Sequence, residues 1–258
     1  MIKDAIAETP IILVLACTVV TVLLAIELGY RVGLWRSRSH EFESEALLSA
    51  MTGANLALLG FIMAFSFSQA ADHHVNRKRL ILAEANAIGT ASLRAGLVDP
   101  AQGEPIRALL AEYLAVRISI ASQEDFDPAK MIADSLELQV LMWEQVEDLS
   151  RAGPADEIDA LLIEAINDVF DIHESRVTAG MRNRLPESLW VALMVLLTLS
   201  MLGIGHFSGL KGRRNPIAST ALALSFSMVF FLIADLDRPL KGLVRSDQSA
   251  MLELSERL

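Results

Sequence analysis

LALLGFIMAFSFSQAADHHVNRKR, residues 56–79, begins as an apolar segment and ends as a charged one. No residue that would break a helix separates the two parts, because neither Gly nor Pro occurs between Gly60 and Gly89. A run with this composition predicts a single helix that crosses a membrane and continues into water.

The composition of the whole chain also indicates a membrane protein. Of its 258 residues 53% are hydrophobic, and the mean hydropathy of +0.42 is too high for an ordinary soluble domain. Four apolar runs approach the ~20 residues that cross a ~30 Å hydrocarbon core. They cover residues 11–30, 47–71, 189–209 and 216–234. Lipid cannot satisfy backbone polar groups and the runs show no barrel-like alternation, so four transmembrane helices are predicted.

The segment between the second and third runs is polar and acidic, which predicts an extramembrane domain. Gly and Pro residues at 96–105, 123–128 and 152–154 divide it into helices, and Pro186 precedes the third run. Apolar residues recur every three or four positions and never alternate, so the fold class is all-α. Two stripes are expected to face the core: Ile132, Leu136, Val140, Trp143, Val146 and Leu149, and Ile158, Leu162, Ile166, Val169 and Ile172.

The expected organisation has four parts. These are a first transmembrane hairpin at 1–72, the helical domain at 73–186, a second hairpin at 187–236 and a C-terminal segment at 237–258. Four spans place the domain and both termini on one side. Basic residues do not decide which side this is, since six occur in the short loops and ten near the span ends on the domain side.

The second run carries the first candidate site. Ala57, Phe61 and Phe65 lie four apart on one helical face, and Ser68 and Asp72 continue that face. Around an oligomer axis, rings of Phe form a hydrophobic constriction, and the hydroxyl and carboxylate at its mouth rehydrate an ion. Ordinary helix packing is the alternative, with close approach allowed by small residues: Gly53, Gly60, Ser66 and Ser68.

Acidic residues in the domain supply most of the net charge of −10. Glu164, Asp168 and Asp171 share one face of its last helix, which is either a solvated face or the lining of a cation path in an oligomer. Earlier, Glu84 lies on a different face from Asn86, as part of either an inter-helix network or a wetted surface. Nucleic acid is not expected as a partner, because the domain lacks a basic patch with interleaved aromatic residues.

The end of the fourth run, Asp235, Asp237, Arg238 and Pro239, forms a second candidate site. Carboxylates at the membrane boundary are costly unless they are paired or wet, so Asp235 is a functional candidate. Local pairing with Arg238 or Lys241 is the alternative.

Enzymatic and metal sites are not indicated. The spans contain no paired aspartates, no HExxH and no Gly-x-Ser-x-Gly, and an intramembrane enzyme therefore ranks last. The five histidines form no ligand spacing, and the single Cys17 excludes a cysteine-based site within one chain. We expect neither a cofactor nor a bound metal.

GFIMAFSFSQAADHHVNRKRLILAEANAIGTASLRAGL, residues 60–97, together with DLDRPLKG, residues 235–242, resembles the bestrophin-like family of bacterial four-span membrane proteins, relatives of the bestrophin ion channels. The resemblance implies a pentamer whose second span forms the neck of a pore. It also implies a cytoplasmic domain and a C-terminal segment that packs on a neighbouring subunit. Neck positions would fall on Ala57, Phe61 and Phe65, and the turn after the last span on Asp237, Pro239 and Gly242.

The chain departs from that family at points that bear on function. Ser66 stands where bacterial bestrophins tend to have Arg, and His74 and Val75 replace an aromatic pair. Calcium gating is not implied, since the acidic run of animal bestrophins after the fourth span has no counterpart here.

The sequence therefore predicts a homo-oligomeric ion channel of the bacterial inner membrane, with lipid and inorganic ions as its other partners. Acidic residues near the path favour cations over anions. The alternative is a non-conducting, membrane-anchored interaction or sensor module that acts through the acidic domain.

Overall fold

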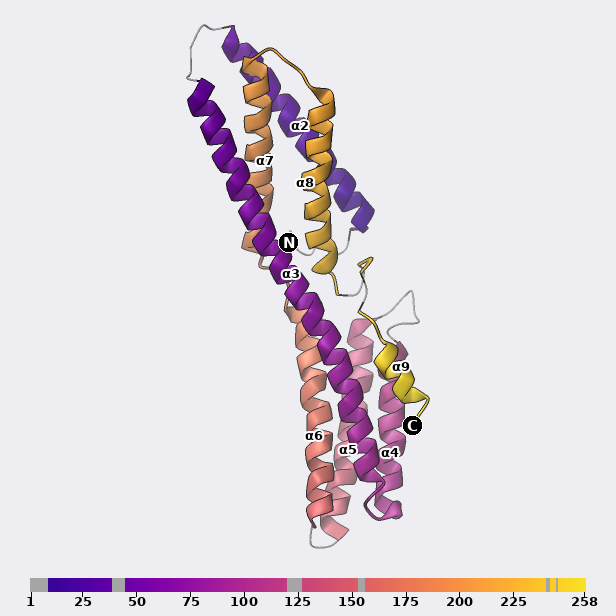
Figure 1. Cartoon of the computed structure of the whole chain (residues 1–258). Coiled ribbons are helices and arrows are strands. Elements are labelled where there is room, and N and C mark those ends of the chain that lie inside the picture. Colours follow the sequence, from indigo (N-terminus) through magenta and orange to yellow (C-terminus); the bar gives the residue numbers. More distant parts are fainter. Residues whose placement is uncertain (1–8, 39–44, 120–126, 153–155, 240–241, 245) are drawn as a thin grey trace. The chain divides into compact units, whose positions relative to one another are not determined.

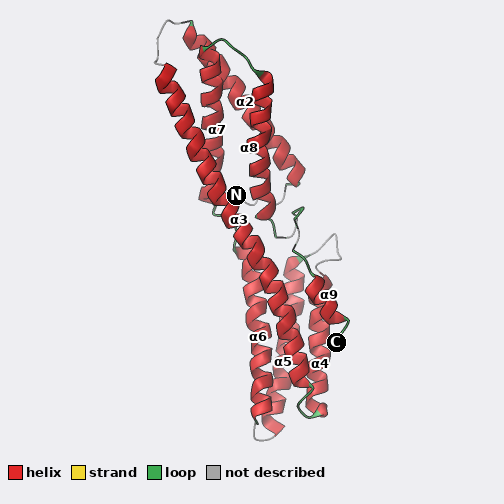
Figure 2. Ribbon diagram, viewed as in Figure 1, coloured by secondary structure: helices red, strands yellow, loops and turns green. Residues whose placement is uncertain are grey.

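The computed structural model describes residues 9–38, 45–119, 127–152, 156–239, 242–244 and 246–258. Every regular element in these residues is a helix, so the predicted all-α fold class is confirmed (Figure 2). The helices, labelled in Figure 1, are α2 (Ile11–Ser37), α3 (Glu45–Ala95), α4 (Pro100–Ile118), α5 (Pro128–Ala152), α6 (Glu157–Val177), the π-helix η2 (Thr178–Arg182), α7 (Glu187–Leu210), α8 (Pro216–Leu236) and α9 (Ser249–Ser255).

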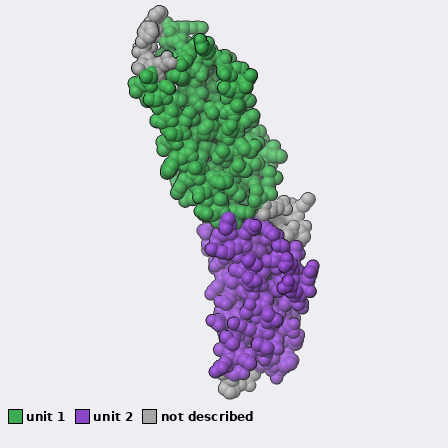
Figure 3. All heavy atoms as spheres, viewed as in Figure 1, with its two compact units in different colours: residues 1–74, 184–245 green, residues 75–183, 246–258 purple. Residues whose placement is uncertain are grey.

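The chain divides into two compact units (Figure 3). Unit 1 comprises residues 1–74 and 184–245, and unit 2 comprises residues 75–183 and 246–258. The division falls inside α3, which runs without a break from Glu45 to Ala95 and contributes its first part to unit 1 and its second part to unit 2.

Helices α2, α3, α7 and α8 are the four that are long and apolar enough to cross a membrane among the described residues. They coincide with the four predicted spans. The helix predicted from residues 56–79 is also present, since α3 includes both the apolar Phe61 and the charged Arg79.

Backbone contact between α2 and α7 organises unit 1. Two glycine pairs, each four residues apart, line the contact: Gly29 and Gly33 on α2, and Gly205 and Gly209 on α7. A Cβ atom on Gly29 would lie 2.2 Å from the carbonyl oxygen of Leu202, and one on Gly205 would lie 2.0 Å from that of Ile26. No side chain fits at these positions. In lipid, where apolar burial does not hold helices together, such close approach is a main source of association.

The remaining core of unit 1 joins these two helices to α3 and α8. Leu59 and Met63 from α3, with Leu197 from α7, are almost fully buried in it. Trp190 of α7 contacts Phe230 of α8 edge to face, with ring centroids 5.4 Å apart. Aromatic pairs in this geometry add to the stabilisation that burial gives.

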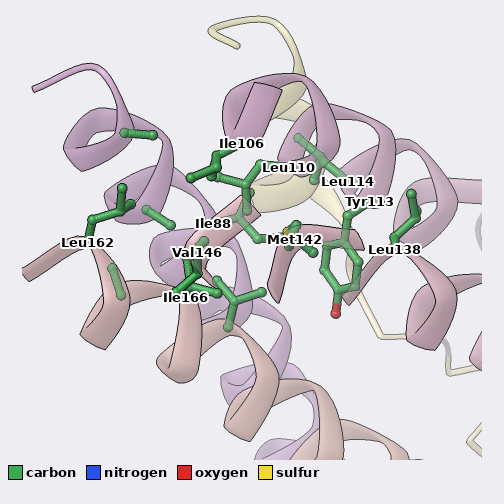
Figure 4. Packing of buried hydrophobic residues seen from close by; sticks show 14 of the residues in the cluster. Ile88, Ile106, Leu110, Tyr113, Leu114, Leu138, Met142, Val146, Leu162 and Ile166 are labelled. Atoms are coloured by element: carbon green, nitrogen blue, oxygen red, sulfur yellow. The ribbon is translucent and has the colours of Figure 1, made fainter. Parts of the chain in front are cut away.

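The core of unit 2 contains side chains from α3, α4, α5, α6 and α9 (Figure 4). The stripe predicted for residues 158–172 is confirmed at Leu162, Ile166 and Val169, which are fully buried. Ile158 at its start is exposed.

The stripe predicted on α5 is partly wrong. Val146 and Leu149 are buried, but Leu136, Val140 and Trp143 are 47%, 59% and 37% exposed. The core instead receives an adjoining face of α5, which includes Ser135, Leu138 and Met142. Both faces repeat every three or four residues, so periodicity could not distinguish them.

The C-terminal helix α9 packs within its own chain. Met251 is fully buried in the core of unit 2, and Leu254 lies over Gly89 of α3. Packing of residues 237–258 on a neighbouring subunit stays a prediction.

The contact between α2 and α7 predicts a sharp difference between two neighbouring glycines. Gly205→Ala should destabilise the protein by roughly 1–3 kcal/mol, because the new methyl group overlaps a backbone carbonyl. Gly203→Ala is the matched control, since its Cβ would lie 3.6 Å or more from Thr52. Thermal unfolding of the two variants in detergent measures the difference; equal midpoints would contradict it.

Candidate functional site

Helix α3 has two opposite faces in unit 1. Leu59, Met63, Ser66 and Ala70 are between 0% and 3% exposed and pack against the other helices. Phe61 lies about half a turn away, because successive residues are rotated by about 100°. Its side chain is 66% exposed, so the aromatic face of α3 points away from the core of its own subunit.

The predicted pore residues of the second span share this outward face. Phe65 is 51% exposed, and Ala57, Ser68 and Asp72 are exposed with it. The structure therefore brings all five onto one side of one helix, while their role in a pore stays a prediction. We call this surface, made by Ala57, Phe61, Phe65, Ser68 and Asp72, the outer face of α3.

Small residues flank the outer face. A Cβ atom added to Gly53 or Gly60 would have no other atom within 4 Å. Among the described residues, these two glycines therefore contact no other helix of the subunit, and ordinary helix packing, the alternative from sequence, stays open for contacts with another helix. Ser66 does belong to the interior, where its hydroxyl donates to the carbonyl of Ile62 at 2.7 Å.

The predicted acidic residues lie together on α6 in unit 2. Glu164, Asp168 and Asp171 are all exposed on one side of that helix. Glu164 Oε2 is 3.8 Å from Nη1 of Arg94, a distant and solvated ion pair that contributes little to stability. These carboxylates are available to solvent or ions.

The turn after α8 uses its carboxylates inside the subunit. Asp235 is 1% exposed and accepts hydrogen bonds from the backbone N–H groups of Leu243 and Val244, at 2.7 and 3.1 Å. Asp237 accepts one from the N–H of Leu185 at 2.8 Å, just before α7 begins. Backbone amides are thus the hydrogen-bond partners of Asp235, and the charge of Arg238, considered from sequence, also acts on this carboxylate. Lys241 lies outside the described residues.

Two arginines, the half-buried Arg184 and the buried Arg238, accompany this turn. Arg184 Nε lies 3.8 Å from Oδ2 of Asp237, and Arg238, followed by the half-buried Pro239, is 3% exposed. Gly242 lies so near that a Cβ atom would be 2.9 Å from the carbonyl oxygen of Asp235. The arrangement holds residues 242–244 against the end of α8, and it is a structural connection within one chain.

A third polar cluster lies in unit 2. The structure shows Glu84 in an inter-helix network, one of the two alternatives from sequence, with partners that sequence did not identify. Glu84 of α3 is completely buried and meets Arg117 of α4, whose Nε lies 3.0 Å from its Oε1. Arg176 of α6 also pairs with Glu84. Tyr113 donates its hydroxyl hydrogen to Glu84 at 2.7 Å, and His173 Nδ1 lies 2.9 Å from the same hydroxyl.

Comparison with known proteins supplies a family. The sequence model of the Bestrophin-like domain matches residues 12–251, nearly the whole chain. The chain belongs to the Bestrophin-like family. No curated protein matches it in sequence.

Solved structures agree on the fold. A single-residue variant of a bacterial bestrophin homologue from Klebsiella pneumoniae is 16% identical, with 97% of each chain covered and a TM-score of 0.60. A second structure, described as a membrane protein, is 17% identical over 96% of each chain, with a TM-score of 0.61. At this identity the likeness shows the fold alone, and it extends over both units of this Bestrophin-like protein.

The protonation states of the buried cluster follow from its hydrogen bonds. Burial alone would raise the pKa of Glu84, but Arg176 and Arg117 lower it below its usual value, so the group is ionised. Tyr113 has one hydrogen and gives it to Glu84. His173 therefore donates from Nδ1 to the Tyr113 oxygen, and its buried Nε2 has no hydrogen-bond partner among the described residues.

Protonation of His173 is disfavoured by its surroundings. Burial first, and then the charge of Arg117, lower the pKa of its imidazole to about 4. A third positive charge beside Arg117 and Arg176 would face a single carboxylate. The cluster is consequently a link among α3, α4 and α6 that requires a neutral imidazole.

The positions of these residues in the helical repeat could have indicated from sequence that they are buried. Glu84 lies between Ile81 and Ile88 on the buried side of α3, and His173 follows Val169 by four residues on that of α6. Ionisable residues at core positions need partners. No three His, Cys, Asp or Glu side chains in the described part of the chain come together as a metal site would require.

Stability of the Bestrophin-like chain should fall as the pH drops from about 6.5 to about 4. In this window His173 binds a proton in the unfolded chain but not in the folded one. The contribution of His173 to the unfolding free energy is fully present above this pH window. It is lost as the pH falls through the window, which lowers the unfolding free energy by about 3 kcal/mol at most.

Denaturant unfolding in detergent at several pH values measures this slope. His173→Gln should make it shallower. Equal slopes in the wild type and His173→Gln would show that His173 titrates normally.

Proposed function

We propose that this protein is the subunit of a homo-oligomeric ion channel of the bacterial inner membrane, a pentamer whose pore is lined by α3. The helical domain, residues 73–186, lies in the cytoplasm. The single observation that carries the proposal is the outer face of α3, where Phe61 and Phe65 point away from the subunit that holds them.

The polar end of this face supports a wet axis over a lipid contact. Asp72 and Ser68 follow Phe65 on the same side of the helix and are exposed. A carboxylate facing lipid is costly, but one that faces water in a pore keeps its hydration. The face thus changes from apolar to hydrated along its length.

The uncovered glycines beside the outer face of α3 support close contact between neighbouring subunits. Gly53 and Gly60 leave room for a second helix, and small residues commonly line helix contacts in membranes. Helices that meet there would direct Phe61 and Phe65 toward a common axis. Closing such contacts by rotation forms a ring.

Conduction would be controlled at the two aromatic rings. Apolar side chains around a narrow axis expel water and so exclude an ion that cannot lose its hydration. Ala57 makes a wider ring at one end, and Ser68 with Asp72 receives the ion at the other. The narrow region is therefore short.

Charge favours cations as the conducted ions. Asp72 on α3, and Glu164, Asp168 and Asp171 on α6, are exposed carboxylates. Rings of such groups along a wetted path attract cations and repel anions. The net charge of the whole chain, −10, is negative like these carboxylates.

Ion flux from proteoliposomes tests the proposal. Phe61→Ala and Phe65→Ala should each increase sodium and potassium flux, because a smaller side chain widens the constriction and admits water. Leu199→Ala is the matched control: Leu199 is an equally exposed apolar residue, at 51%, but it lies on α7. Its flux should equal that of the wild type.

Two outcomes would contradict the proposal. Chloride flux exceeding cation flux would overturn the selectivity. No flux in any variant, from folded and oligomeric protein, would overturn conduction and favour the membrane-anchored interaction module.

A further inference from the structure

A cluster of basic residues surrounds the ends of α2 and α7, at the end of unit 1 shown uppermost in Figure 1. Arg214, in the turn from α7 to α8, joins the two helices: its Nη2 lies 3.2 Å from Oε1 of Glu27, and its guanidinium lies 4.3 Å from the ring centre of Tyr30. We call the basic residues here the cationic rim: Arg31, Arg36, Arg38, Lys211, Arg213 and Arg214.

Within the described residues 27–38 and 207–215, Glu27 is the one residue with a carboxylate. Glu27 Oε1 accepts from Arg31 at 2.7 Å and from Arg214 at 3.2 Å, so both guanidinium groups share one oxygen atom. The side chains of Arg31 and Arg214 nevertheless remain 73% and 60% exposed. Basic residues therefore outnumber acidic ones within residues 27–38 and 207–215.

The conformation of the turn from α7 to α8 leaves its basic side chains at the surface. Gly212 adopts a φ of 60°, and its N–H donates to the carbonyl of Gly209 at 3.0 Å, which ends α7. The left-handed conformation reverses the chain at the span end and suits glycine. Lys211 and Arg213 on either side are both exposed.

Large apolar side chains are exposed beside these cations. Trp35 is 72% exposed, Ile217 is 82% exposed and Val32 is 47% exposed. A surface that offers cations and apolar side chains together at the end of membrane spans matches a lipid, with its charged headgroup and its acyl chains. Free phosphate would use only the cations.

We propose that the cationic rim binds the phosphate group of an anionic phospholipid. Arg213 and Arg214 form the principal contacts, because guanidinium groups bind phosphate oxygens in pairs. Arg214 is already oriented by Tyr30 and Glu27, and Trp35 and Ile217 meet the acyl chains. This binding does not depend on whether the protein conducts ions.

Thermal unfolding of the full-length protein in a neutral detergent tests the inference. Dioleoyl phosphatidylglycerol should raise the midpoint by roughly 3–6 °C at about ten times its dissociation constant, more than dioleoyl phosphatidylcholine does. The variant R213Q/R214Q should lose this difference. R107Q/R151Q is the matched control, because it removes from unit 2 two arginines whose side chains are 41% and 68% exposed, each paired within its own helix, and it should keep the difference.

If the double variant does not fold, R213Q alone is tested. It should lose part of the difference between the midpoint shifts that the two lipids cause. The segment that follows α2 also contains Glu41 and Glu43. If such carboxylates occupied the rim, the two lipids would stabilise the wild type equally, and the inference would be overturned. A shift of the same size with inorganic phosphate alone would overturn it as well, since a free anion would then suffice.

Discussion

Helix α3 packs along one side only, and this constraint governs how the subunit can be used. Leu59 and Met63 hold it to the rest of unit 1, whereas Phe61 points outward from the same turns. A transmembrane helix satisfies its own backbone, so its free side must be covered by lipid or by another helix. The carboxylate of Asp72 at the end of that side favours a hydrated neighbour over lipid, which is why assembly around an axis explains the face best.

Two different kinds of interaction stabilise the units. In unit 1, α2 and α7 meet at their backbones through Gly29 and Gly205, so their association depends on the absence of side chains. In unit 2, apolar burial is supplemented by the charges around Glu84, with Arg117 and Arg176 as its partners. Burying such charges costs desolvation energy, but removing one partner leaves an uncompensated buried charge and is strongly destabilising. The position of α3 in the domain thus depends on a particular set of charges.

Sequence predicted the features that depend on the composition and periodicity of many residues. It missed the features that depend on single contacts. Span positions, the all-α class and the common face of Phe61 and Phe65 follow from composition and helical periodicity. Periodicity failed on α5, where two adjoining faces have equal spacing and only the tertiary contacts select Met142 over Val140. The partners of Asp235 are backbone amides eight and nine residues away, which no residue pattern indicates. The two glycine pairs of α2 and α7 were readable in the sequence, but only the structure shows that they face each other.

Cross-linking of α3 to α3 tests the shared axis most directly. The background variant is Cys17→Ser, which removes the single native thiol; Phe61→Cys is then added on the outer face, or Met63→Cys on the buried face as a control. Membranes are treated with a short bismaleimide reagent, and covalent subunit pairs are counted on a denaturing gel. An axis lined by α3 predicts linked subunits with Phe61→Cys and none with Met63→Cys. Oligomeric protein in which Phe61→Cys forms no linked pair would contradict that axis.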